Sequence, residues 1–422
     1  MRPTAEVAPP RRIGAPTDTR PFSFVRLFGG TWLSYSTYAV LLAVLPLAEL
    51  AEGGGPLLAT LVIGAPLLAQ TLASWGWGWL ADRTGARRRP LVLAMAVQAP
   101  MFLAFPVLDA PELFLVRLAQ SALFGSVVLA TTQATEDPAV SSAFRLGRLQ
   151  LATSGGMLTG IVVALPLLIG ARFRLDSVEG WELSGLLATV TALSALVFAL
   201  AGELHRPPAP PRRASFGIAS HPGLFRLAVA TAAVSTVRYI PVTAIPVYLA
   251  ETLGAGGFFG IPMNPTAQLA VWLGVSSALN IGAAPLSGRL AHGTSTRRFG
   301  MFGFSLMYAG LWTALFLFPN YSVTFAVWIL PVSVFLVVAT VREAAALSQP
   351  DQRGRAIGLV TAAFNLGGLL GGAIAGSLLA RGVSAPHVFE VAAVGGLIAA
   401  ALFFPRLVRL PPPIETARTT GS

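Results

Sequence analysis

The sequence predicts an all-α integral membrane protein whose twelve transmembrane helices form two pseudo-symmetric six-helix bundles. Composition is the first reason, because 54% of the 422 residues are hydrophobic and only 11% are charged. A soluble protein needs a surface that is roughly a quarter charged or more. The second reason is that apolar runs of about 20 residues, long enough to cross a hydrocarbon core as a helix, recur along the whole chain. The third is a sequence pattern that repeats at half length.

Twelve apolar runs have the length of a membrane crossing, and each reads as a helix because the backbone must satisfy its own hydrogen bonds in lipid. Their approximate spans are 27–49, 57–80, 90–108, 113–135, 146–169, 182–201, 224–249, 267–290, 300–318, 322–345, 356–379 and 387–405.

The distribution of arginine predicts the orientation. All 29 basic residues are arginine, a bias typical of a GC-rich bacterial genome. If the N-terminus is cytoplasmic, the only arginines on the outer side are Arg172, Arg174 and Arg381, as the positive-inside rule requires. The sequence therefore predicts a multi-pass protein of the bacterial inner membrane with both termini in the cytoplasm. The net charge of +11 is explained by this topology, so nucleic acid is not an expected partner.

Two pairs of sequence landmarks indicate an internal duplication. Gly78–Arg88 reads GWLADRTGARR, and Gly288–Arg298 reads GRLAHGTSTRR in the same frame. Pro138 with the later Gly155-Gly156 recurs as Pro350 with Gly367-Gly368 at nearly the same offset. Many transporters are built from such repeats. The expected organisation is a cytoplasmic tail (1–21), an N-terminal bundle (22–203), a proline-rich cytoplasmic linker (204–221), a C-terminal bundle (222–410) and a second tail (411–422).

The first of these landmarks resembles the loop motif between the second and third helices of the major facilitator superfamily. The twelve helices and the half-length repeat are similar to that family as well. The resemblance implies a transporter, in which the motif's aspartate holds the two halves together on the cytoplasmic side of the outward-open state. An ordinary orienting loop is the alternative. The residues that correspond to this latch are Gly78, Asp82, Arg83, Gly85, Arg87 and Arg88.

The residue types suit the latch. Gly78 would let a neighbouring helix approach closely, and Asp82 sits where a carboxylate can face the positive end of a helix. Gly85 supplies a tight turn. The second copy has His292 in place of the aspartate, so a latch there is expected to be weaker or pH-dependent.

Two further motifs match the family in part. Arg117-Leu118-Ala119-Gln120-Ser121 resembles its R-x-x-Q-G element, with serine in place of glycine. Gly156-x-x-x-Gly160 resembles its antiporter motif, but isoleucine follows where that motif has proline. The glycine spacing recurs at Gly368, Gly372 and Gly376, and it favours close helix packing over a substrate contact.

The first, fourth, seventh and tenth helices of the family line its central cavity. Arg238 lies near the middle of its predicted span, where facing lipid would cost at least about 2.5–3.5 kcal/mol, so it is expected to face the cavity. Arg117 lies nearer the outer end, where it could also snorkel or meet Glu112. The candidate cavity residues are Tyr35, Tyr38, Arg117, Gln120, Gln133, Arg238, Tyr239, Asn280, Trp328 and Asn365.

The sequence thus predicts a secondary active transporter that moves a small organic solute by rocker-switch alternating access. Efflux is favoured because the overall pattern resembles the drug and sugar efflux branches. The alternatives are an importer or exchanger of organic anions that uses Arg117 and Arg238, and a membrane protein of the same fold that transports nothing. Proton coupling would have to use acidic groups near helix ends, namely Glu49, Glu112, Glu136 or Glu343.

An enzyme is not expected. The chain has no cysteine and four histidines, all in predicted loops or at helix ends, and no phosphate-binding glycine loop. These features predict no metal site and no cofactor. The expected partners are a small-molecule substrate and membrane lipids, and the expected state is a monomer. The glycine-rich outer loop 251–265 could cap the cavity.

Overall fold

The computed structural model describes residues 23–51, 56–136, 142–169, 174–202, 222–251 and 265–404. Every regular element within these residues is a helix. The predicted tails 1–21 and 411–422, the linker 204–221 and all but the two ends of the outer loop 251–265 lie outside the described residues.

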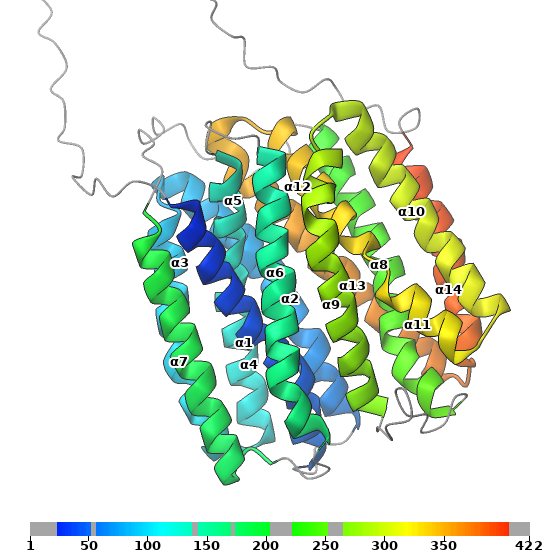
Figure 1. The fold of residues 1–422 in the computed structure, drawn as a ribbon, viewed down its shortest axis with the longest axis horizontal. Helices are drawn as coiled ribbons and strands as arrows, with labels where there is room; N and C mark the ends of the chain where they lie inside the picture. Colours follow the sequence, from blue (N-terminus) through cyan, green and yellow to red (C-terminus); the bar gives the residue numbers. More distant parts are fainter. Residues whose placement is uncertain are drawn as a thin grey trace, which may run out of the picture.

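Twelve helical passes run side by side through the molecule (Figure 1). The first six are α1 (Phe24–Ala51), α2 (Pro56–Thr84), α3 (Arg88–Met101) continued by η1 (Phe102–Val107), α4 (Ala110–Phe124) continued by η2 (Gly125–Val127) and α5 (Val128–Glu136), α6 (Ser142–Ile169), and α7 (Val178–Leu200). The last six are α8 (Pro222–Glu251), α9 (Pro265–Leu290), α10 (Thr294–Leu317), α11 (Tyr321–Ile329) followed by α12 (Val332–Leu347), α13 (Arg353–Ala380) preceded by η3 (Pro350–Gln352), and α14 (Ala385–Phe403).

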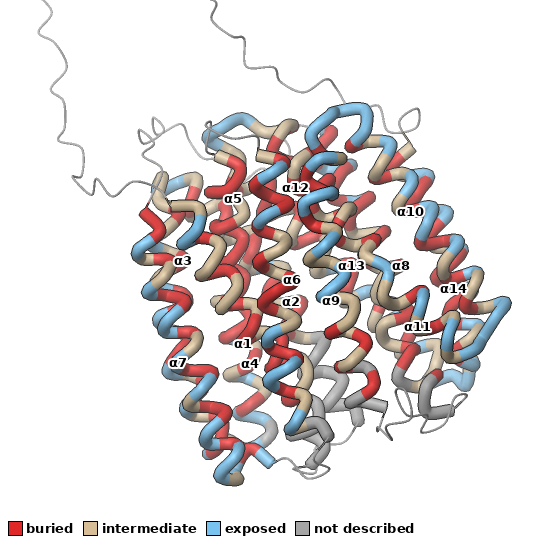
Figure 2. The backbone as a smooth tube through the Cα atoms, in the orientation of Figure 1, coloured by how far each residue is buried: buried red, intermediate tan, exposed pale blue. Residues whose placement is uncertain are grey.

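Eleven of these passes are long and apolar enough to cross a membrane, judged on the described residues. The remaining pass is α2, whose side chains are described only from residue 65 onward. Large apolar side chains such as Val107 and Val394 are exposed on the outer surface, and Figure 2 shows exposed positions along outer helices such as α7 and α10. An apolar exterior around a helical bundle is what a lipid environment requires. The predicted fold class is confirmed.

Three passes that the sequence predicted as single helices are interrupted. The third pass changes to the 3-10 helix η1 after Met101. The fourth pass tightens to a 3-10 turn at Gly125, where a Cβ would lie 3.1 Å from the side chain of Ala73 on α2. The tenth pass breaks after Ile329, and Leu330 there is extended with ψ of 130°. Pro331 explains that break, because proline lacks an N–H and excludes the helical conformation from the residue before it.

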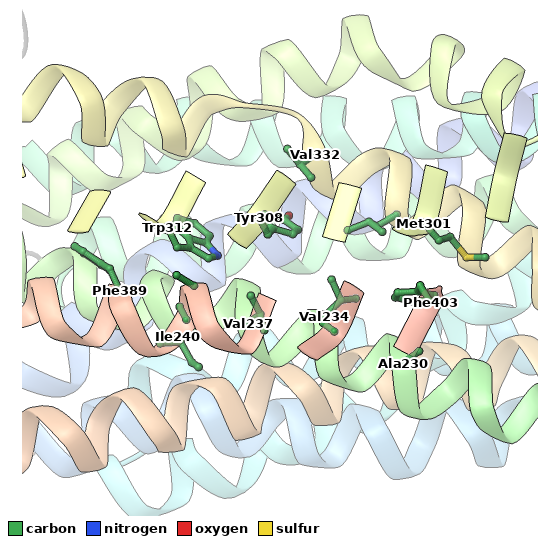
Figure 3. Packing of buried hydrophobic residues seen from close by; sticks show 14 of the residues in the cluster. Ala230, Val234, Val237, Ile240, Met301, Tyr308, Trp312, Val332, Phe389 and Phe403 are labelled. Carbon is green, nitrogen blue, oxygen red and sulfur yellow. The ribbon is translucent and has the colours of Figure 1, made fainter. Parts of the chain in front are cut away.

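Each half has its own apolar core. In the C-terminal half, side chains of α8, α10 and α14 interdigitate, and Figure 3 shows Val237, Tyr308 and Phe389 among them. One core of the N-terminal half also contains residues of the C-terminal half, including Val341 and Ile357. The two halves are therefore packed together, and not merely adjacent, at the end of the molecule where α2 ends and α13 begins. We call it the Asp82 end.

The most extensive contacts between the halves are those of α2 with α13 and of α6 with α9. Glycines allow both approaches. A Cβ on Gly78 of α2 would overlap the Gly354 carbonyl oxygen of α13. A Cβ on Gly147 of α6 would lie 2.7 Å from the Ala284 carbonyl oxygen of α9. Both pairs therefore depend on backbone-to-backbone contact at the Asp82 end.

The glycine series on α13 packs inside the C-terminal half, but one residue earlier than predicted. Gly367 and Gly371, one turn apart, lie against the backbone of α8. Gly376 has open space around it, and Gly372 lies at ordinary contact distance from Thr243. The backbone contacts thus fall one residue earlier than predicted, although Gly368 also packs tightly, against the Tyr239 ring of α8 and Leu67 of α2. The predicted close packing holds at Gly368 and fails at Gly376. The spacing predicted a row of small residues on this helix. It could not predict which glycine of each adjacent pair contacts the backbone of α8.

We expect Gly371→Ala to lower stability by about 1–3 kcal/mol, because the new methyl group would overlap the Thr236 carbonyl oxygen. Gly376→Ala on the same helix is the matched control, and it should be neutral or slightly stabilising. Thermal unfolding of the purified protein in detergent measures both. Equal midpoints for the two variants would contradict this packing.

Candidate functional site

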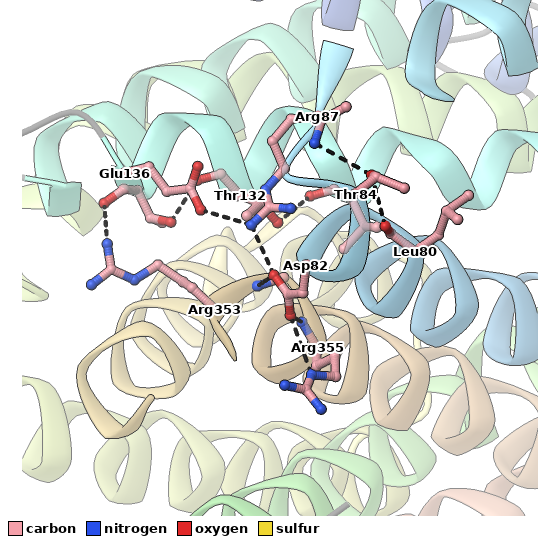
Figure 4. Close-up of polar contacts among 12 residues, drawn as sticks. Leu80, Asp82, Thr84, Arg87, Thr132, Glu136, Arg353 and Arg355 are labelled. Carbon is pink, nitrogen blue, oxygen red and sulfur yellow. Dashed lines mark hydrogen bonds and ion pairs between the residues drawn. The ribbon is translucent and has the colours of Figure 1, made fainter. Parts of the chain in front are cut away.

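The carboxylate of Asp82, in the last turn of α2, caps a helix of the other half. Its Oδ1 accepts a hydrogen bond from the Gly354 N–H at 3.0 Å, and its Oδ2 accepts one from the Arg355 N–H at 2.7 Å. These amides belong to the first turn of α13, where backbone N–H groups have no partner within their own helix. The helix dipole adds a favourable charge interaction there. One side chain thus joins the two halves (Figure 4).

Arg87, at the start of α3, links the same carboxylate to a third helix. Its Nη2 lies 2.8 Å from Asp82 Oδ1 and 3.2 Å from Glu136 Oε1 at the end of α5. All three side chains are at most 5% exposed. Arg353 adds a further link between the halves by donating to the Thr135 carbonyl oxygen at 3.2 Å. Buried charges in this network are paired, as a low-dielectric setting requires.

The other predicted latch residues have different positions. Gly85 has φ of 70°, a left-handed conformation that suits glycine, and it turns the chain from α2 to α3. Arg88 donates to the Ala199 carbonyl oxygen of α7 at 3.1 Å, inside its own half. Arg83 is exposed, with its guanidinium carbon 5.2 Å from the centroid of the Trp79 ring. Arg88 and Arg83 therefore support the loop and make no described contact with the other half.

The second half repeats the ion pairs. Arg297 Nε and Arg298 Nε donate to the two oxygens of Glu343 at 2.6 and 2.9 Å. This cluster corresponds to Arg87 with Glu136. His292 occupies the position of the aspartate, is exposed, and stacks on Phe144 of α6 at 5.7 Å between ring centroids.

Aromatic rings surround the two arginines that lie within the passes. Tyr38 of α1 stacks on Phe124 of α4, with 4.6 Å between centroids, and the Arg117 guanidinium carbon lies 5.8 Å from the Tyr38 ring. In the other half, the Arg238 guanidinium carbon lies 5.4 Å from the Tyr239 ring and 5.7 Å from the ring of Phe364. Cation–π contacts of this kind suit a cation away from bulk water.

The two aromatic groups are neighbours across the two halves. Tyr38 and Tyr239 are close enough to interact electrostatically. Gly368 of α13 lies beside both the Tyr239 ring and Leu67 of α2, which places Tyr239 against the junction between the halves. Tyr35 contacts Phe124 edge-on, at 5.3 Å between centroids. The predicted residues Tyr35, Tyr38, Arg117, Arg238 and Tyr239 therefore form one connected central group.

Several predicted cavity residues are buried with polar atoms that no described residue satisfies. Gln120 and Gln133 of the fourth pass are at most 1% exposed. Both amide atoms of Gln120, the amide nitrogen of Gln133, the amide oxygen of Asn280 and the indole nitrogen of Trp328 have no hydrogen-bond partner. Asn365 is partly buried beside Phe364.

The sequence did not predict three further residues that contact the central group, namely Gln70, Phe124 and Phe364. Gln70 hydrogen-bonds the Tyr38 hydroxyl from α2, a helix that the family comparison did not place on the cavity. Phe124 lies two turns after Arg117 on the same pass, and this helical spacing is the signal that could have found it. Among the described residues, no cluster of three or more His, Cys, Asp or Glu could hold a metal ion.

The structure does not bring Arg117 and Glu112 together. Glu112 is exposed in the first turn of α4, whereas Arg117 is 2% exposed. Residues five apart on a helix point in different directions, so the suggested pair was unfavourable from the start. Of the other acidic candidates for proton coupling, Glu136 and Glu343 are in ion pairs. The side chain of Glu49 lies outside the described residues.

We expect Asp82→Asn to open the Asp82 end, because an amide cannot accept both backbone hydrogen bonds and also bind Arg87. The chain has no cysteine, so Ile357→Cys gives a single labelling site. Ile357 is 0% exposed and lies in the core shared by the two halves. Maleimide labelling of this cysteine should be faster in the Asp82→Asn background and unchanged with Asp176→Asn, which alters an exposed carboxylate. Equal labelling rates in both backgrounds would argue against a closing role for Asp82.

We expect Glu343→Gln to destabilise the protein by about 3–5 kcal/mol, because it leaves Arg297 buried without its partner. Their side chains are 0% and 1% exposed. Asp176→Asn is the control, since its pair with Arg174 is more than half exposed and should contribute less than about 1 kcal/mol. Thermal unfolding compares the two, and similar midpoints would show that the buried cluster is not structural.

Comparison with known proteins places this fold among transporters. The human organic anion transporter MFSD10 is 16% identical, with a TM-score of 0.67 over 92% of this chain and 100% of that chain. The E. coli fucose:proton symporter FucP is 14% identical, with a TM-score of 0.67 over 90% and 97%. A bacterial homologue of the iron transporter ferroportin is 17% identical, with a TM-score of 0.66 over 90% and 98%. At these identities the likeness concerns the fold. No curated protein matches the sequence.

The sequence model of the Major Facilitator Superfamily matches residues 27–342, which is most of the chain. The family and the solved structures with this fold are transporters and not enzymes. The expected resemblance is therefore confirmed, and the chain belongs to the Major Facilitator Superfamily.

Proposed function

We propose that this protein is a secondary active transporter that exports a small organic solute across a bacterial inner membrane. The two halves, bounded at 22–203 and 222–410, rock about the central group and open it to each side in turn. The protein works as a monomer in contact with membrane lipids. The observation that carries the proposal is the Asp82 carboxylate bound to the first turn of α13.

This contact has the strength that a reversible latch needs. A hydrogen bond to a charged group contributes about 1.5–3 kcal/mol, and Asp82 accepts two from the other half. Moving a two-state equilibrium from 1:99 to 99:1 takes about 5.5 kcal/mol. Breaking the cap is therefore large enough to shift the population of states and small enough to be reversed by ligand binding.

The arginine distribution assigns the Asp82 end to the cytoplasm, so the state with the cap intact faces outward. In the proposed cycle, this is the state in which the central group is reached from the outer side. Release of the cap would open the same group to the cytoplasm.

The central group supplies the substrate site in this proposal. Tyr38 and Tyr239 belong to different halves, so a solute held between them is contacted by both and responds to their relative movement. Aromatic faces bind sugars and flat apolar molecules. Arg238 is partly buried and bonded to no carboxylate, and it is the polar anchor of the site.

Uptake or exchange of organic anions is the second candidate function. It is favoured by Arg117 and Arg238, which meet aromatic rings where a cation transporter would need carboxylates. The two functions differ in the direction of net flux and in the effect of a proton gradient, so one assay separates them.

We expect saturable counterflow of a labelled solute in proteoliposomes that contain the purified protein. The solute comes from a thermal-shift screen over sugars, organic anions and drugs. Arg238→Gln should reduce counterflow by roughly tenfold or more, because it removes a charged hydrogen-bond donor from the site. Arg381→Gln, an exposed position at the other end, is the control and should transport normally.

An imposed pH gradient gives the direction in the same vesicles. Export predicts accumulation on the side that corresponds to the exterior, and exchange predicts that a gradient adds nothing to counterflow. Flux that never saturates, or counterflow that is equal in wild type and Arg238→Gln for every bound solute, would refute the proposed carrier and its anchor.

A further inference from the structure

Arg117 presents a charge that the described protein does not neutralise. It lies on α4, is 2% exposed, and its guanidinium meets the ring of Tyr38 and no described carboxylate. The Nη1 nitrogen is buried without any hydrogen-bond partner. An ionised side chain left unpaired in a low-dielectric interior costs several kcal/mol. Something other than the described side chains must offset that cost.

Two further residues on the same face of α4 also have buried polar atoms without a described hydrogen-bond partner. Gln120 and Ser121 are 0% exposed, and the Gln120 amide and the Ser121 hydroxyl have no partners. Positions three and four residues after Arg117 lie beside it on a helix. Buried polar groups in proteins are almost always hydrogen-bonded, so three adjacent unsatisfied residues point to a missing ligand. A guanidinium, an amide N–H and a hydroxyl are all donors available to one acceptor.

Among the side chains that the structure describes, no acid near Arg117 provides the missing charge. Glu112 is exposed at the start of α4, and Asp82 and Glu136 are held by Arg87 at the Asp82 end. Water could satisfy the hydrogen bonds of these groups but would leave the positive charge uncompensated. The deficit therefore calls for a negatively charged ligand.

We propose that Arg117, Gln120 and Ser121 bind one monovalent anion inside the N-terminal bundle. A single arginine balances a single negative charge, and the near-complete burial fits a small group such as a halide ion or a carboxylate. The ring of Tyr38 lies beside the Arg117 guanidinium and stacks on Phe124. A free chloride ion or the carboxylate of an aromatic solute that reaches past Tyr38 would present the same chemistry.

Anion binding at this site can be measured without transport, because an anion that binds the folded protein stabilises it even when no gradient is present. It also gives Arg117 a role distinct from that of Arg238, which is only partly buried and sits between Tyr239 and Phe364. The proposal adds an anion requirement to the proposed carrier and does not depend on the direction of transport.

The test is thermal unfolding of the purified full-length protein in detergent. In one arm sodium chloride replaces sodium methanesulfonate at constant ionic strength. In the other arm sodium benzoate is added, with benzyl alcohol as the uncharged control. A ligand that binds only the folded state raises the unfolding midpoint in a concentration-dependent way. We expect such a rise with chloride, with benzoate or with both, and none with benzyl alcohol.

Variants locate the effect. Arg117→Met should abolish the anion dependence and, in methanesulfonate alone, unfold at a higher midpoint than wild type because the unpaired charge is gone. Gln120→Leu and Ser121→Ala should each weaken the anion affinity by roughly tenfold, since each removes a hydrogen bond to a charged ligand. Arg381→Gln removes an exposed arginine of the C-terminal half and should respond as wild type does.

A response to chloride assigns a free ion, and a response to benzoate alone assigns the carboxylate of a solute. The inference is overturned if neither anion raises the wild-type midpoint, if benzyl alcohol acts as benzoate does, if the response persists in Arg117→Met, or if the anion affinity is unchanged in Gln120→Leu. Should Arg117→Met not fold, Gln120→Leu decides. Counterflow that continues in a protein without any anion response would refute this site and leave the proposed carrier intact.

Discussion

The hydrogen bonds between the Asp82 carboxylate and the first turn of α13 are the interaction on which the arrangement of the two halves depends. They use amides that every helix leaves unpaired at its start, so an acceptor on the opposite half suffices to make the contact specific. Glycine at positions 78 and 354 lets the two backbones come close enough for that acceptor to reach. The contact lies at one end of the molecule only, so in the proposed cycle its release opens that end without dismantling either half.

The arginines at the Asp82 end and those in the middle of the passes have different kinds of partner. At the Asp82 end, buried arginines meet carboxylates, as Arg87 does with Glu136 and Arg297 with Glu343. These pairs hold the ends of consecutive passes together within each half. In the middle, Arg117 and Arg238 meet aromatic rings. The first arrangement fixes structure, and the second leaves positive charge that a solute or an ion can neutralise.

Much of this architecture follows from the sequence, because lipid imposes a simple rule. A helix must span about 30 Å of hydrocarbon, so apolar length and arginine placement reveal the passes. The motif around Asp82, through its resemblance to the family's loop, predicted a carboxylate that faces a helix end. The sequence could not predict which helices, distant in the chain, contact each other. The turn at Gly125 depends on Ala73 of another helix, the place of Gln70 depends on Tyr38, and the glycine register on α13 depends on α8.

Alternating access is tested most directly by distances at both ends of the molecule. Spin labels at Arg89 and Asp351 report the Asp82 end, and labels at Glu182 and Arg381 report the opposite end; all four positions are exposed. Pulsed electron resonance distances in lipid, compared between the native latch and Asp82→Asn, should show a longer population at the Asp82 end and a shorter one at the opposite end. A single unchanged distance at both ends, with and without Asp82, would contradict the account.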